Sequence, residues 1–300
     1  MPEEHHSGTR PDGDAGEARV ERRSPKEVFS LLGDETRIAI LYALDETPGE
    51  AVSFSELRER VGTPDSGQFN YHLGKLADHF VRKTEDGYEL TVAGTDVVGA
   101  LRAGRYTADV SIDPIELDDP CPRCGGTMTA AYEDEHVQIR CVDCEDWGNR
   151  FIFPPGTVEQ FDRAELPAAF DRWMWTILDQ TMEGFCPNCS GRIDADLQPD
   201  EDRPKGMAIT FDCARCGVVA ETNPTALLTP HPVVVSFYHD HGIDVRSTPT
   251  WELYLRIDRT VERLQSDPLR IRVEIDIDDE RLVAIVDETA SITSVERESD

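Results

Sequence analysis

The sequence predicts an α+β fold with more than one domain, and three observations carry that prediction. Apolar residues recur at helical spacing in the amino-terminal third, eight cysteines form four C-x2-C pairs in the middle, and alternating apolar residues mark strands near the carboxy terminus. A chain of 300 residues is long enough for two or three domains. Its hydrophobic content of 39% is ordinary for a protein with buried cores.

Residues 1–23 are polar, charged and rich in glycine, so we expect a disordered tail there. They hold no apolar core of the kind that a secretory signal needs. No apolar run in the chain approaches the roughly 20 residues of a membrane span. We therefore expect a cytoplasmic protein without a membrane partner.

The chain is strongly acidic, with 60 acidic against 30 basic residues, and only four of the basic residues are lysines. Hydrated carboxylates keep proteins soluble in molar salt, so we interpret this composition as that of a halophilic archaeal protein. The acidity is uneven. Residues 111–300 hold 39 acidic and 17 basic side chains, whereas residues 55–83 hold four acidic and five basic ones.

Residues 24–109 read as four helices, a hairpin and a closing helix. "SPKEVFSLLGDETRIAILYAL" offers Ser24 as a cap and breaks at Gly33-Asp34, and in "SFSELRERV" the pair Ser53 and Glu56 fits a capping box. After the turn "GTPD" a helix is expected over 66–79. A hairpin turning at Asp86-Gly87 and the helix "TVAGTDVVGALRAG" follow. This order predicts a winged helix-turn-helix.

One face of the helix over 66–79 is apolar, because Phe69, Leu73, Leu76 and Phe80 share a stripe. The opposite face is polar and suits the major groove of DNA, where glutamine and asparagine pair with adenine. The free amides at the start of the helix suit a phosphate. The candidate DNA-binding residues on this helix and on the hairpin are Ser66, Gln68, Asn70, Tyr71, Lys75, Arg82 and Lys83.

The stretches "LLGDETRIAILYAL", "FSELRERVG", "GQFNYHLGKL" and "DGYELTVAG" together resemble the ArsR-type winged helix-turn-helix of archaeal and bacterial regulators. The resemblance covers about a quarter of the chain. It implies a homodimer that reads two half-sites of double-stranded DNA, with Gln68, Asn70 and Tyr71 at groove-facing positions. Metal-sensing members place thiolates on the helix before the turn, and "SFSELRERV" has no cysteine. Metal sensing at that position is therefore not expected.

The cysteine spacing predicts two zinc ribbons, one over 110–156 and one over 185–224. In each, two C-x2-C turns joined by a hairpin bring four thiolates onto one ion, and with no open position the ion is structural. A rubredoxin-like iron site, a redox-active disulfide pair and a swapped pairing of the two halves remain alternatives. "CVDCED" lacks the usual glycine after its second cysteine. The candidate ligands are Cys121, Cys124, Cys141, Cys144, Cys186, Cys189, Cys213 and Cys216.

The remaining segments read as connectors and a carboxy-terminal region. "SIDPIELDDP" reads as a linker ahead of the first ribbon, and residues 157–184 read as a mainly helical connector interrupted at Pro167, with Trp173, Ile177 and Leu178 packing on the ribbons. Residues 225–300 are expected to add a helix ended by Gly242, a helix over "TWELYLRIDRTVERL" and an antiparallel β-meander that packs on the ribbons. Ile271 to Ile277 alternate strictly, which predicts one buried and one solvated face.

We find no glycine-rich phosphate loop, nucleophile elbow or pair of catalytic acids, and therefore expect no enzyme. The favoured hypothesis is a sequence-specific transcriptional regulator with a zinc-stabilised effector or interaction region. The alternative is a general transcription accessory protein that contacts the transcription machinery. It would be similar to the archaeal initiation factor E, which also joins a winged helix to a zinc ribbon.

Overall fold

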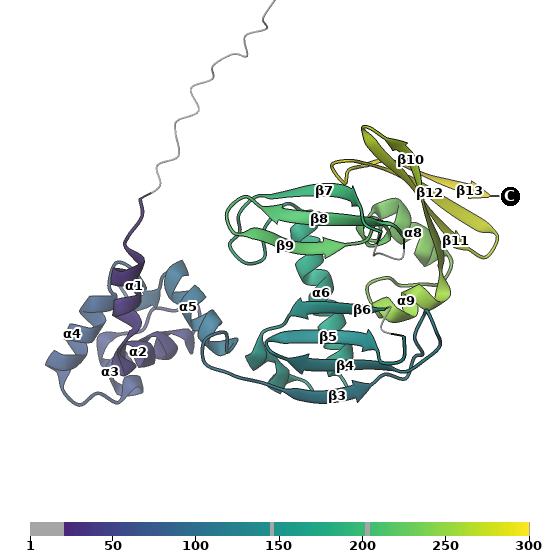
Figure 1. Cartoon of the computed structure of the whole chain (residues 1–300). Helices are drawn as coiled ribbons and strands as arrows, with labels where there is room; N and C mark the ends of the chain where they lie inside the picture. The colour runs from purple at the N-terminus through teal and green to yellow at the C-terminus, as the bar shows by residue number, and fades with distance from the viewer. Residues whose placement is uncertain (1–20, 145–146, 202–204, 300) are drawn as a thin grey trace, which may run out of the picture. The chain divides into compact units, whose positions relative to one another are not determined.

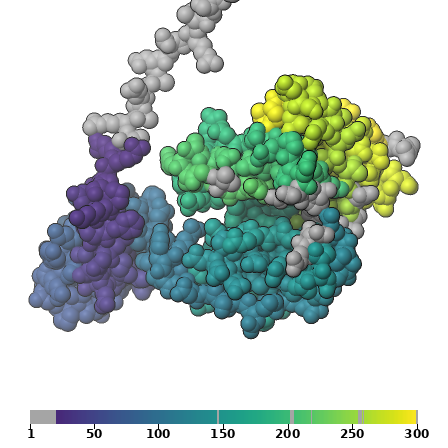
Figure 2. Space-filling view, in the orientation of Figure 1, coloured from purple at the N-terminus to yellow at the C-terminus, as the bar shows by residue number. Residues whose placement is uncertain are grey.

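A computed structural model describes residues 21–144, 147–201 and 205–299 of the chain, so most of the tail expected over 1–23 lies outside the described residues. The chain mixes helices with antiparallel sheets and forms two compact units, which divide between Leu101 and Arg102 (Figure 1, Figure 2). Residues 102–109 belong to the second unit and not, as the sequence predicts, to the first domain. Among the described residues, no helix has the length and apolar character that crossing a membrane requires.

Among its described residues, the first unit has five helices and a two-stranded antiparallel hairpin. Its elements are α1 (Pro25–Leu32), α2 (Glu35–Asp45), α3 (Phe54–Val61), α4 (Ser66–Leu76), β1 (Val81–Lys83), β2 (Tyr88–Leu90) and α5 (Val92–Arg102). The expected break between the first two helices is present, because the side chain of Asp34 caps α2 by accepting from the amides of Thr36 and Arg37.

Helix α4 is shorter than expected, since it ends at Leu76 and not at residue 79. Ala77 takes an extended conformation and Asp78 has a φ of 66°, so the chain turns sharply before the hairpin. The expected apolar stripe is still buried, because Phe69, Leu73, Leu76 and Phe80 all lie in the core of this unit.

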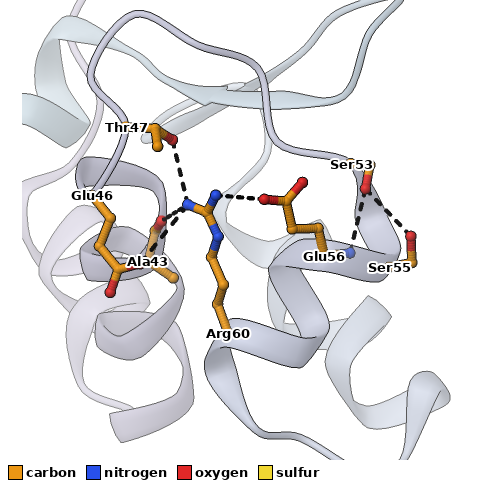
Figure 3. Close-up of polar contacts among 7 residues, drawn as sticks. All are labelled: Ala43, Glu46, Thr47, Ser53, Ser55, Glu56 and Arg60. Carbon is orange, nitrogen blue, oxygen red and sulfur yellow. Dashed lines mark hydrogen bonds and ion pairs between the residues drawn. The ribbon is translucent and has the colours of Figure 1, made fainter.

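Arg60 joins α3 to the end of α2 (Figure 3). Its guanidinium donates to the carbonyl oxygen of Ala43 at 3.0 Å and to Thr47 Oγ1 at 3.3 Å, and it pairs with Glu56 at 2.5 Å. Ser53 accepts from the Glu56 amide as the capping box predicts, but the Glu56 carboxylate turns to Arg60. Arg60 thereby satisfies carbonyl and hydroxyl groups at the end of α2 and holds α3 against it.

The second unit begins with a four-stranded antiparallel sheet in the order β3-β4-β5-β6. The segment expected to be a linker forms its first strand, because Ile112 and Ile115 pair with Tyr132 and Ala130 of the next strand. The strands are β3 (Ile112–Glu116), β4 (Met128–Glu133), β5 (His136–Cys141) and β6 (Gly148–Ile152).

Helix α6 (Leu166–Met182) takes part in both cores of the second unit. Phe170 packs in the core of the first sheet, and Leu178 packs in the core that contains the second sheet. A 3-10 turn (Pro155–Gln160) precedes the helix, and Pro167 lies in its first turn, so this proline begins the helix and does not interrupt it. Trp173 packs on the first core, and so the expected common stripe with Leu178 is divided between two cores.

The rest of the second unit is a three-stranded antiparallel sheet, three short helices and a four-stranded antiparallel meander in the order β10-β11-β12-β13. Ile271, Val273, Ile275 and Ile277 face the core as their alternation predicts. The elements are β7 (Ile193–Pro199), β8 (Met207–Cys213), β9 (Gly217–Thr222), α7 (Pro224–Leu228), α8 (Pro232–Asp240), α9 (Thr250–Arg256), β10 (Asp258–Ser266), β11 (Leu269–Ile277), β12 (Glu280–Asp287) and β13 (Ile292–Ser299).

The prediction of a helix over "TWELYLRIDRTVERL" is wrong for the second half of this segment. Helix α9 ends at Arg256, and from Asp258 the chain is a strand that pairs with β11, with Arg259 opposite Ile275 and Val261 opposite Val273. Pairing with a distant strand outweighs the local helical pattern, because it satisfies the backbone of a whole strand at once.

Candidate metal centres and nucleic-acid interface

The eight cysteines form two groups of four, in sequence order and not swapped. In the first, Cys121 Sγ lies 3.9 Å from Cys144 Sγ, and Cys124 Sγ lies 3.6 Å from Cys141 Sγ. In the second group, Cys189 Sγ lies 3.5 Å from Cys213 Sγ and 3.6 Å from Cys216 Sγ. A tetrahedral ion with metal–sulfur bonds near 2.3 Å needs sulfur atoms about 3.8 Å apart. Both groups therefore have the dimensions of a four-thiolate metal site.

The two first knuckles, "CPRCGG" and "CPNCSG", have the same backbone bonding. The Cys121 amide donates to Gly126 O at 2.8 Å, and the Cys186 amide donates to Gly191 O at 2.9 Å. Amides also point at the sulfurs, as from Arg123 to Cys121 and from Asn188 to Cys186, both at 3.4 Å. Each knuckle thus returns the chain so that two sulfurs face one point.

The thiols within each group differ in acidity. Amides of Cys144 and Asp143 donate to Cys141 and lower its pKa to about 7, and the Arg215 amide does the same for Cys213. The pKa of Cys216 rises to about 12 because the sulfurs of Cys186 and Cys189 lie beside it. Four thiolates so close together repel one another, and a bound cation removes that repulsion. The donor set therefore fits a divalent metal ion.

Burial differs between the ligands. Cys121, Cys141, Cys186 and Cys213 are buried, whereas Cys124 and Cys216 are exposed. The residues that follow Cys144, where the usual glycine is missing, lie at 145 and 146, outside the described residues. In the second group Gly217 follows Cys216 with a φ of 98°, a conformation that favours glycine.

All seven candidate DNA-binding residues lie at the surface of the first unit. Five of them, Ser66, Gln68, Asn70, Tyr71 and Lys75, are exposed on α4, opposite the buried stripe. The ammonium of Lys75 lies 5.4 Å from the centre of the Tyr71 ring. This contact holds a cation and an aromatic ring together on the exposed face of the helix.

The other two candidates, Arg82 and Lys83, are exposed on β1. Arg82 pairs with Glu89 across the hairpin, with 2.9 Å between Nη2 and the carboxylate. Lys83 lies 5.9 Å from the centre of the Tyr88 ring. The hairpin thus presents one cation already paired with a carboxylate and one stacked on an aromatic ring.

The start of α4 is not the open phosphate site that the sequence suggested. The Asp65 carboxylate accepts from the amides of Gly67 at 2.7 Å and Gln68 at 2.9 Å. The Gln68 and Gly67 amides lower the pKa of Asp65, so the cap is anionic. A phosphate at this helix end would have to displace a carboxylate that already uses the same donors.

His72 lies on the inner side of α4, with its Nδ1 3.3 Å from a carboxylate oxygen of Asp34, the cap of α2. This contact and the roles of Arg60 and Asp65 are not among the predictions from the sequence. Asp65 had a local signal, since an aspartate before a helix is a strong cap. The other two contacts join elements that only the tertiary fold brings together.

The fold and the sites thus define a two-unit α+β protein with two four-cysteine sites of metal-binding geometry. The chain belongs to the family described as Domain of unknown function (DUF7351), whose model matches residues 118–292, more than half of the chain. A model described as Domain of unknown function (DUF7347) matches residues 25–101. That match ends at Leu101, where the first compact unit also ends. Comparison with curated proteins gave no match.

Proposed function

We propose that the chain is a sequence-specific DNA-binding regulator of transcription, with a winged helix-turn-helix in its first unit. The observation that supports this most is the exposed polar face of α4. Gln68 and Asn70 are the side chains on that face that can read adenine. Residues 55–83 carry five basic and four acidic side chains, so this segment is near neutral, and molar salt screens the acidity of the rest of the chain beyond about 3 Å.

Arg82 is paired with Glu89, and the amides at the start of α4 are occupied by the Asp65 carboxylate. Few groups on this surface therefore remain to bind phosphate. Binding would therefore depend on a few base contacts more than on charge, and would tolerate the salt in which an acid-rich protein stays soluble. This favours a specific reader in molar salt. A non-specific, charge-driven binder would need more free lysine and arginine on this surface.

The test is selection of duplexes from a random-sequence library by the full chain in molar KCl. We expect a recurring sequence to be enriched, and Gln68→Ala with Asn70→Ala to abolish the enrichment without lowering the unfolding temperature. The control is Asp96→Asn, an exposed change on α5 that touches none of the seven candidate DNA-binding positions. If the wild-type chain enriches no sequence, the accessory protein that contacts the transcription machinery becomes the better hypothesis.

We also propose that the chain is a homodimer, which an operator with two half-sites would require. Phe29 on α1 is 66% exposed and Val92 at the start of α5 is 79% exposed, so the first unit presents large apolar side chains to solvent. Sedimentation analysis tests this proposal. A dimer is expected, and Phe29→Glu should shift it toward monomer, whereas a monomeric wild-type chain would contradict the proposal.

We propose that both four-cysteine sites hold zinc and that the second unit is an effector or interaction region stapled by these ions. Four thiolates at tetrahedral spacing with no open position are typical of structural zinc, which stabilises the fold and supplies no chemistry. Elemental analysis of protein that has not been reconstituted should give roughly two zinc ions per chain. Substantial iron would overturn the assignment.

A further inference from the structure

A cavity of about 910 Å³ lies within the second unit, walled by β6 of the first sheet, by α6 and by β9 of the second sheet. Figure 2 shows the surface hollowed between the teal residues of the first sheet and the green residues of the second. Both β6 and β9 are edge strands of their sheets. The volume falls in the range of about 300–1,000 Å³ that small-molecule sites occupy.

One wall of the cavity is apolar and uncovered. Ile152 on β6 is 64% exposed, and Phe151, Trp173, Trp175 and Val219 are half-buried beside the cavity. Trp173 is fixed in place, because its indole N–H donates to Ile152 O at 2.9 Å and its ring packs edge-on against Phe153. A concave apolar surface with fixed aromatic rings is suited to an apolar body of ring size.

The side chains that line the cavity carry a net positive charge, whereas the net charge of the chain is negative. Its lining contains Arg105, His136, Arg150 and Arg259 against Glu135 and Glu221, in a chain with twice as many acidic as basic residues. Arg105 and Arg150 are exposed, and neither forms an ion pair within the part of the chain that the structure describes. Two cations at one cavity that pair with no carboxylate among the described residues favour an anionic guest.

Arg105 is held at the cavity by a close backbone contact. Gly104 has a φ of 68°, and a Cβ there would lie 2.9 Å from Gly156 N. The Gly156 amide donates to Ala103 O at 3.0 Å, which fixes the segment before Arg105 against the 3-10 turn that follows β6. The backbone that carries the cation is therefore ordered before any ligand arrives, which lowers the entropy cost of binding.

We propose that this cavity binds a small organic anion that has an apolar body, such as an aromatic ring, and one carboxylate or sulfonate group. The body would cover Ile152 and the two tryptophans, and the anionic group would meet Arg105 and Arg150. An inorganic anion would leave the apolar wall uncovered, and a neutral ring would leave the arginines unpaired. The proposal does not depend on DNA binding by the first unit.

The test is calorimetric titration of the full chain, as purified with its metal, with naphthalene-2-carboxylate and with naphthalene-2-carboxamide as the neutral match. We expect one carboxylate per chain and binding of the amide weaker by about ten-fold or more, as the loss of a charged hydrogen bond predicts. Arg105→Gln with Arg150→Gln should weaken the carboxylate by a similar factor and leave the amide unchanged. Arg140→Gln, an exposed arginine of the same sheet outside the cavity, is the control.

A second variant tests the apolar wall. Ile152→Glu adds a negative charge at an exposed position and should abolish carboxylate binding, whereas Leu264→Glu, also exposed but on β10 and outside the cavity, should not. Unfolding temperatures of all variants show whether they are folded. Equal affinity for the two compounds, unchanged affinity in the double arginine variant, or no heat from either compound at millimolar concentration would each overturn the proposal.

Discussion

The two four-cysteine modules have the same local geometry and different surroundings. Both first knuckles close with the same backbone bonds, from Cys121 to Gly126 and from Cys186 to Gly191. The first module packs around Tyr132 and Phe153 with the start of α6, in a core of its own. The second shares one core with the carboxy-terminal meander. Four-thiolate geometry is therefore a local property of a short motif, whereas its contribution to stability depends on what else shares the core.

Removing one ligand from each module should have the largest effect and should separate the two. Cys121→Ala and Cys186→Ala should each lower the metal content from roughly two ions per chain to about one, because three thiolates hold the ion far less tightly. Hydrogen exchange should show unprotected amides only in β3–β6 for Cys121→Ala. For Cys186→Ala the loss should extend through the meander, because those strands share the second core.

The control for this pair is Ser294→Ala, an exposed change on β13 that should alter neither metal content nor protection. If both cysteine variants lose protection over the same strands, the two cores unfold as one. The two modules would then differ in which residues surround them but not in how they unfold.

Asp171 links α6 to α9, which contributes to both cores. It is 4% exposed and accepts from the Thr250 hydroxyl at 2.6 Å and from the Thr250 amide at 3.2 Å. Burial raises the pKa of Asp171 to about 6, even though both bonds from Thr250 and the charge of Arg172 lower it. The folded protein therefore keeps a proton that the unfolded chain releases near its ordinary pKa.

The raised pKa of Asp171 therefore adds to the free energy of unfolding below pH 4. This contribution, about 3 kcal/mol, is lost as the pH rises from 4 to 6. In Asp171→Asn the neutral amide still accepts from Thr250, so the variant should lose less stability than the wild type between pH 5 and 6 in urea titrations. The metal sites are unchanged between the two proteins, and so the difference isolates this residue. Parallel pH curves for the two proteins would contradict the assignment.

Features set by short stretches of sequence were predictable. The cysteine groups follow from C-x2-C spacing, and the buried face of β11 follows from strict alternation of its isoleucines and Val273. The order of helices and hairpin in the first unit follows from caps and turns at Asp34, Ser53 and Gly87. In each case the determining residues lie within one element or next to it.

Features that join distant parts of the chain were not predictable. The segment after Arg256 has a helical pattern, and only pairing with β11 makes it a strand. Residues 112–116 read locally as an acidic linker, and only pairing with β4, which begins twelve residues later, makes them a strand. The cavity needs β6, α6 and β9 together, and no local pattern connects Arg150 to Val219. Long-range pairing and packing decide such features, and a single sequence does not display them.

The glycines that close the two knuckles provide a smaller test. A Cβ on Gly191 would lie 2.8 Å from Cys213 Sγ and 3.1 Å from Cys189 Sγ, two atoms that the metal site fixes. A Cβ on Gly126 would lie 2.8 Å from the Cβ of Asp143, which the backbone fixes, and the Asp143 carboxylate accepts from the Thr127 amide. Gly191→Ala and Gly126→Ala should therefore each cost about 1–3 kcal/mol of unfolding free energy, as overpacking does. Denaturant titration with metal analysis measures both, and an unchanged unfolding free energy in either variant would show that the neighbouring atoms give way.

The smallest effect tests whether the two knuckles are equivalent in backbone energy. Gly125 has a φ of 75°, and Ser190, its counterpart, has a φ of 53°. A left-handed conformation costs a residue with a Cβ about 1–2 kcal/mol, and the flexibility of glycine in the unfolded chain offsets roughly 0.5–1 kcal/mol of that. Both positions are exposed, and nothing lies within 4 Å of a Cβ at Gly125.

The exchange Ser190→Gly should therefore stabilise the second module by somewhat less than about 1 kcal/mol, and Gly125→Ser should destabilise the first by a similar amount. Urea titrations at fixed zinc concentration measure both changes, with the double exchange as an internal check that they cancel. If Ser190→Gly destabilises, the Ser190 side chain contributes something that glycine cannot replace, and the two knuckles are alike in hydrogen bonding but not in energy.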